Sequence, residues 1–130
     1  MNINGLDFIW LEVNSIKESI EFYRDMLGLI VDDSDAESEP PMATVRAGKL
    51  KIILGEDFKP MITRGRGINL FLSVSDVDQY YLDLKSRGMR IEPPADEGWG
   101  GRFITIKDPD GYRIFFFTWT AASEWPIFIS

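Results

Sequence analysis

Two residue types that carry much of enzyme chemistry are missing from this chain of 130 residues, which has no histidine and no cysteine. Thiolate nucleophiles, imidazole bases, Cys- or His-type metal ligands and disulfide bonds are therefore excluded. An enzyme built from this chain would have to use carboxylates, Lys, Arg, Tyr or a cofactor. The side chains left for recognition are aromatic rings beside a few polar groups, and their spacing is informative.

Aromatic and polar residues share one face of the probable strands, because successive residues of a strand point to opposite faces. That face collects Phe8, Trp10, Glu12, Asn69, Phe71, Ser73, Phe103, Thr105, Arg113, Phe115, Phe117 and Trp119. The other face is mostly aliphatic and is expected to lie under helices. Rigid rings beside the carboxylate of Glu12 suit a planar or cationic organic molecule, through stacking and cation–π attraction of about 1 kcal/mol each.

The elements that would position these residues begin with a β-α-β-β-β module. The β-branched and aromatic content of residues 5–13 predicts a strand. Asn14 or Ser15 can then cap a helix that ends at Gly28. A strand, an acidic loop and a hairpin are expected next, at 29–31, at 32–39 and at 42–46 with 50–54.

The second half of the chain predicts the same order. A strand over 68–74 precedes a helix that Asp76 can cap and Gly88 can end. A short strand over 89–91 and a hairpin around D-P-D-G at 108–111 complete the module.

An internal duplication accounts for this repetition. Val13-Asn14-Ser15-Ile16 and Val74-Ser75-Asp76-Val77 are similar and lie 61 residues apart (74 − 13). The interpretation is one domain over 1–130, with module 1 at about 1–57 and module 2 at about 67–120. The apolar segment 121–130, with Trp125, Ile127 and Phe128, is expected to dock on the domain or on a partner subunit.

Two motifs carry a resemblance to a known family. Residues 19–28 read S-I-E-F-Y-R-D-M-L-G and residues 108–114 read D-P-D-G-Y-R-I. With the two modules, they resemble the vicinal oxygen chelate superfamily, which includes glyoxalase I, extradiol dioxygenases, fosfomycin-resistance enzymes and bleomycin-resistance proteins. The resemblance implies an α+β fold in which two βαβββ modules form a curved, cup-shaped mixed sheet with helices on the outer face.

The same resemblance implies where a metal would be held, on the first and last strands of each module. Those positions fall on Phe8, on Lys51 or Ile53, on Asn69 and on Phe115. One carboxamide beside apolar rings supplies neither the charge nor the donors of a divalent metal site. We therefore expect no metal and no cofactor.

These observations favour metal-independent binding of a small planar or cationic compound, similar to bleomycin-resistance-like members of the family. Glu12, Asn69, Ser73 and Arg113 would then orient a ligand among apolar walls, since unpaired polar groups are costly in a filled core. Such members carry a similar Trp-Gly beside the ligand groove, which makes Trp99 a candidate wall residue.

Three alternatives remain at this point. The chain could be a lyase or isomerase that uses Glu12 as its base without a metal. The rings could instead fill the cup of an interaction module, in which case nothing binds there. Trp99 could be a hydrophobic plug of its glycine-rich loop.

Composition narrows the class of partner. The formal net charge is −7, which disfavours binding to nucleic acid and to anionic membranes. The sequence predicts no membrane span and no targeting segment, so a cytoplasmic protein is expected. Related proteins are commonly dimers, and a homodimer is expected here.

Overall fold

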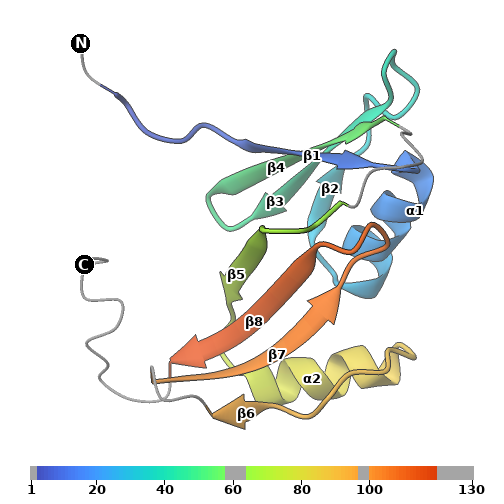
Figure 1. The fold of residues 1–130 in the computed structure, drawn as a ribbon. Coiled ribbons are helices and arrows are strands. Elements are labelled where there is room, and N and C mark those ends of the chain that lie inside the picture. Colours follow the sequence, from blue (N-terminus) through green and yellow to red (C-terminus); the bar gives the residue numbers. More distant parts are fainter. Residues whose placement is uncertain (1–2, 58–63, 97–99, 120–130) are drawn as a thin grey trace. The chain divides into compact units, whose positions relative to one another are not determined.

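The computed structural model describes residues 3–57, 64–96 and 100–119, and the chain forms two compact units, Met1–Arg64 and Gly65–Ser130 (Figure 1). Each unit contains one four-stranded mixed sheet and one helical segment on one face of that sheet. Within the described residues, no helix is long and apolar enough to cross a membrane.

Unit 1 has the predicted β-α-β-β-β order. Its sheet runs β1-β4-β3-β2, with β1 parallel to β4 and the other neighbours antiparallel. The elements are β1 (Ile9–Val13), α1 (Ile16–Ile20), the π-helical segment η1 (Glu21–Met26), β2 (Ile30–Asp32), β3 (Met42–Ala47) and β4 (Leu50–Glu56).

Unit 2 repeats this topology. Its sheet runs β5-β8-β7-β6, with β5 parallel to β8. The elements are β5 (Asn69–Ser73), α2 (Val77–Ser86), β6 (Ala95–Asp96), β7 (Gly101–Lys107) and β8 (Arg113–Trp119). Two units with the same strand order and the same parallel pair support the internal duplication.

Capping residues begin both helices where the sequence predicts them. The hydroxyl of Ser15 accepts a hydrogen bond from the backbone N–H of Glu18 at 3.2 Å, and the Asp76 carboxylate accepts one from Gln79 at 3.1 Å. The apolar face of α1 packs on β3 and β4 in unit 1, and the apolar face of α2 packs on β7 and β8 in unit 2. The cores of the two units form there, around Leu11, Val13, Ile16, Ile20, Tyr23, Val45, Ile52 and Leu54 and around Leu70, Val77, Leu84, Ile104, Ile114 and Phe116.

An ion-pair network joins α2 to its sheet. The guanidinium of Arg102 on β7 donates to both carboxylate oxygens of Asp78 at 2.9–3.2 Å and to Asp96 on β6 at 3.3 Å. The hydrogen bonds from Arg102 lower the pKa of Asp78 below its ordinary value. The first turn of the helix is thereby tied to the edge of the sheet.

Three expected elements differ in the structure. The first strand begins at Ile9 instead of residue 5, because its ladder starts at the pair Ile9–Ile52. The first helix continues as the π-helical segment η1, in which the N–H of Leu27 bonds to the carbonyl of Phe22 at 3.0 Å.

The third difference is the strand expected at 89–91, which is not formed. The N–H of Met89 bonds to the carbonyl of Leu84 at 3.2 Å, so this residue closes the end of α2. Pro93 and Pro94 follow and have no N–H to donate to a ladder. Only Ala95–Asp96 pairs with β7, as the two-residue strand β6.

Candidate functional site

Among the described residues of unit 2, α2 covers one face of the sheet and leaves the opposite face uncovered, and we call this second face the open face. The register places its side chains in rows that cross the strands. The first row is Asn69, Arg113 and Lys107; the second is Phe71, Phe115 and Thr105; the third is Ser73, Phe117, Phe103 and Ala95; the fourth is Trp119 and Gly101. The register therefore brings together all nine residues that the sequence predicts on these strands.

Five rings of this open face touch one another, and we call them the aromatic cluster: Phe71, Phe103, Phe115, Phe117 and Trp119. Phe71 stacks on Phe115 with centroids 4.5 Å apart, and Phe103 packs against Phe115 at 5.5 Å. Phe117 makes edge contacts with Phe71 at 6.3 Å and with Trp119 at 5.2 Å. The contacts hold the rings in a fixed arrangement.

The cluster remains accessible to solvent. Phe71 is 51% exposed and Trp119 is 43% exposed, whereas Ile114 and Phe116 on the helix-covered face are 0% and 1% exposed. Polar residues at its border, Asn69, Ser73, Thr105 and Arg113, are exposed as well. A rigid, exposed apolar surface with polar groups at its border is typical of a site that binds another molecule.

Unit 1 carries the other predicted residues on the corresponding face of its own sheet. Trp10 and Glu12 alternate with the buried Leu11 and Val13, and Phe8 precedes β1. The indole ring of Trp10 lies over Gly55, which has no side chain to occupy that place. Trp10 and Phe8 are both 45% exposed. Trp99 lies outside the described residues, as does the segment 121–130.

The register also settles which residue of β4 corresponds to Phe115. Trp10 and Phe71 each precede the aligned valines, Val13 and Val74, by three residues. Phe115 pairs with Phe71, and Ile53 pairs with Trp10, so Ile53 occupies the last-strand position of the first module. Lys51 lies one row away.

The four positions where the resemblance implies metal ligands do not fit a metal. They hold Phe8, Ile53, Asn69 and Phe115, and only Asn69 has an oxygen to donate. Phe115 is also packed between two other rings. Elsewhere within the described ranges, no three acidic residues gather as a possible metal site.

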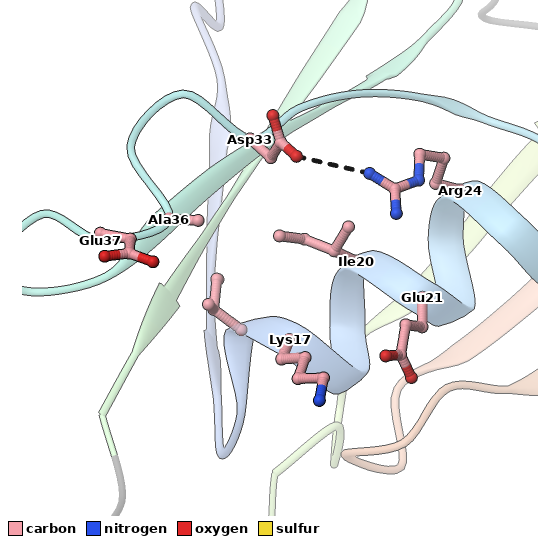
Figure 2. Close-up of a pocket in the computed structure, with 8 residues that line it drawn as sticks. Lys17, Ile20, Glu21, Arg24, Asp33, Ala36 and Glu37 are labelled. Atoms are coloured by element: carbon pink, nitrogen blue, oxygen red, sulfur yellow. Dashed lines mark hydrogen bonds and ion pairs between the residues drawn. The ribbon is translucent and has the colours of Figure 1, made fainter.

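A separate groove of about 380 Å³ lies in unit 1 between α1–η1 and the acidic loop. Figure 2 shows Arg24 directing its guanidinium across the groove toward Asp33, with 3.4 Å between the two groups. Arg24 also binds Asp25 at 2.9 Å, and the two carboxylates raise the pKa of Arg24. The Arg24 side chain therefore holds the loop to the helix. A second hollow of about 420 Å³ lies in unit 2 beside Met89 and Thr105.

Two features of the site were not found from the sequence. Lys107 shares the first row of the open face with Arg113. The alternation of β7 could have predicted the face of Lys107, because it follows Phe103 and Thr105 at a spacing of two residues. Asp108 is buried, and its carboxylate accepts hydrogen bonds from the N–H groups of Asp110 and Tyr112 at 2.9 and 2.8 Å. Its role is to hold the turn that sets β7 opposite β8.

Comparison with known proteins places these features in a family context. The model of the Glyoxalase/Bleomycin resistance protein/Dioxygenase superfamily matches residues 5–116. The protein YraH of Bacillus subtilis (strain 168) is 36% identical over 117 residues, which cover 78% of this chain and 88% of that protein.

Solved structures share the fold. A glyoxalase/bleomycin resistance protein/dioxygenase from Nocardioides superimposes with a TM-score of 0.74 at 21% identity, covering 95% of this chain and 88% of that one. TnmS3, an antibiotic binding protein from Streptomyces sp. CB03234, has a TM-score of 0.74 at 23% identity, covering 91% of this chain and 98% of that one. The expected α+β fold with two repeated modules is confirmed.

Proposed function

Because the chain belongs to the Glyoxalase/Bleomycin resistance protein/Dioxygenase superfamily, we propose that it binds and sequesters a small planar organic compound, without a metal ion and without breaking a bond. The aromatic cluster of unit 2 is the binding surface. Asn69, Ser73, Thr105 and Arg113 orient the polar groups of the compound. On the open face of unit 1, Phe8 and Trp10 form a second, separate contact surface in this proposal, and Glu12 is the counter-charge of that surface for a cationic substituent. Trp99 stays a contact expected from the sequence.

The observation that carries the proposal is the exposed stack of Phe71 on Phe115. Aromatic side chains are strongly apolar, and Phe71 is half exposed although its neighbours hold it in place. A flat compound laid on such a surface gains stacking and apolar burial without a large loss of side-chain entropy. The name of TnmS3, an antibiotic binding protein, supports a ligand of this kind.

Metal-independent binding is favoured by the residues at the family's metal positions. Phe8, Ile53 and Phe115 offer hydrocarbon where a catalytic metal would need nitrogen or oxygen donors. These residues instead add apolar area to the two open faces.

The test is a thermal-shift and tryptophan-emission screen of planar antibiotics and metabolites. Compounds that raise the melting temperature should bind Phe115→Ala more weakly by about 1–3 kcal/mol. The matched control is Tyr81→Ala, which removes a half-buried ring from α2. A screen in which no planar compound changes either signal contradicts the proposal.

We also propose that the protein is a homodimer, as expected from the sequence. Sedimentation at micromolar concentration measures the mass directly. A monomer under these conditions, with unchanged behaviour after deletion of residues 123–130, contradicts both the dimer and the docking of the tail.

A further inference from the structure

A row of polar and cationic side chains borders the aromatic cluster. Arg113 on β8 lies between Asn69 on β5 and Lys107 on β7 in the register. This row is adjacent to the row of Phe71 and Phe115, two residues along the strands, or roughly 7 Å away. A flat molecule stacked on Phe71 can therefore extend a substituent to Arg113 and Lys107.

The described strand residues of the open face of unit 2 include no carboxylate; Glu92 lies beside this face, where it lines the hollow at Thr105 together with Lys85 and Arg90. The twelve residues of this face in the register include two cations, Lys107 and Arg113, and no Asp or Glu. This balance is unusual in a chain of 21 acidic and 14 basic residues. The corresponding face of unit 1 is mixed, because Glu12 and Asp32 share it with Arg46 and Lys51.

The two cations are placed where they repel each other. Lys107 and Arg113 are directly opposite on β7 and β8, and like charges in directly opposite positions destabilise a strand pair. Within the described residues neither side chain forms an ion pair. Arg113 also lies on a strand with neighbours on both sides, so it is not a charge that protects a sheet edge.

The same arrangement occurs in the first module. Arg46 on β3 is directly opposite Lys51 on β4, and this pair lies one row from Ile53, as Lys107 and Arg113 lie one row from Phe115. Both modules therefore keep two facing cations at equivalent places of their open faces. An anion that contacts both members of a pair would convert their repulsion into a stabilising interaction.

We propose that the open face of unit 2 selects planar aromatic compounds that carry an anionic group, such as a carboxylate, sulfonate or phosphate. The inference rests on the proposed function and adds the charge of the ligand. The ring system stacks on Phe71 and Phe115. The anionic group accepts hydrogen bonds from the Arg113 guanidinium and the Lys107 ammonium, and Asn69 donates from its amide.

Three probes of one shape and different charge test this proposal on the full chain: 2-naphthoate, 2-naphthamide and 2-naphthylmethylammonium. Their dissociation constants are measured by calorimetry at low and high salt. The naphthoate should bind about 10-fold more tightly than the neutral amide, since a hydrogen bond to a charged group contributes about 1.5–3 kcal/mol. The ammonium compound should bind most weakly, and added salt should weaken the naphthoate most.

Variants locate the effect. Arg113→Gln and Lys107→Gln should each weaken the naphthoate about 3- to 10-fold, and should weaken it more than they weaken the naphthamide. Arg113→Lys should keep most of the preference, which separates loss of charge from loss of folding. The control Lys49→Gln removes the same charge from the exposed turn between β3 and β4 and should change nothing.

The outcomes separate the two proposals. Equal binding of all three probes, or preference for the ammonium compound, overturns the anion proposal and leaves planar binding in place. No binding of any probe overturns the anion proposal, and it overturns planar binding as well if no compound of the thermal-shift and emission screen binds. If the Gln variants change the sedimentation of the protein but not the affinity for naphthoate, the cations contact a second copy of the chain and the anion proposal is overturned.

Discussion

The rings of Phe71 and Phe115 stack with centroids 4.5 Å apart and with an angle of 6° between their planes. The two residues are register partners on the parallel strands β5 and β8. Phe115 occupies the position at which the family resemblance implies a metal-binding carboxylate. At this position the protein therefore has a ring-to-ring contact and no metal-binding side chain. The surface is thus suited to flat apolar molecules.

The stacked pair should contribute to stability beyond its area. Phe71→Leu and Phe115→Leu, alone and combined, form a double-mutant cycle measured by urea unfolding. We expect a coupling free energy of about 1 kcal/mol, since aromatic pairs are favourable by about that amount. Additive effects within about 0.3 kcal/mol would show that the two rings are neighbours without a specific interaction.

Metal content gives a second prediction. Phe8, Ile53, Asn69 and Phe115 supply one carboxamide oxygen in total, so purified, untagged protein should hold far less than one Zn²⁺, Mn²⁺, Ni²⁺ or Fe²⁺ per chain. Elemental analysis after dialysis measures this. About one tightly held metal ion per chain would refute the prediction. Phe115→Glu alone should not create a site, because the other positions still lack donors.

The side-chain faces of unit 2 could be predicted from the sequence, and the pairings could not. Alternation along a strand is a local property, so the sequence alone predicts that Phe71 and Phe115 share one face. Their contact depends on the register of β5 against β8, which joins residues 44 positions apart (115 − 71). The opposition of Lys107 and Arg113 depends on register in the same way.

Competing local hydrogen bonds explain why the strand expected at residues 89–91 is not formed. Residues 89–91 have the composition of a strand, yet the N–H of Met89 bonds to the end of α2, and Pro93 and Pro94 delay strand pairing to β6. Alignment by motif does not decide whether Lys51 or Ile53 occupies the last-strand position of the first module, because both residues lie on the same face of β4. The pair of Ile53 with Trp10 resolves that ambiguity.

Gly55 gives a prediction about Trp10. A Cβ built on Gly55 would overlap the Trp10 indole, with Cε2 and Cη2 only 2.7 Å away. Gly55→Ala should therefore displace the ring, shift the tryptophan emission and cost about 1–3 kcal/mol of stability. In a Trp10→Ala background the same substitution should cost much less, because the space is then free. An equal cost in both backgrounds would mean that the backbone of β4, and not the indole, resists the methyl group.

The turn between β7 and β8 depends on Asp108. Asp108→Ala leaves the N–H groups of Asp110 and Tyr112 without their acceptor, one of them buried, and should lower the free energy of unfolding by about 2–4 kcal/mol. Asp108→Asn keeps an acceptor oxygen in the same place and should lose less than half as much. Chemical denaturation measures both variants. Similar losses for Ala and Asn would show that the charge, and not the acceptor geometry, stabilises the turn.

Alkaline pH gives the last prediction, through Tyr80 of α2. Its ring packs on Phe116 with centroids 4.7 Å apart, and burial is the main cause that raises the pKa of the Tyr80 phenol to about 12. In the unfolded chain a tyrosine ionises near pH 10. Between about pH 10 and 12 the unfolded state therefore binds fewer protons at Tyr80 than the folded state, so this residue makes stability fall as the pH rises.

The measurement compares wild type with Tyr80→Phe by urea unfolding at pH 8 to 12. Groups common to both proteins cancel in the difference of their unfolding free energies. That difference should be constant below about pH 10 and should then move in favour of Tyr80→Phe, because phenylalanine cannot ionise. A difference that stays constant up to pH 12 would show that the phenol of Tyr80 titrates alike in the folded and unfolded chain, and that its burial against Phe116 costs the phenolate nothing.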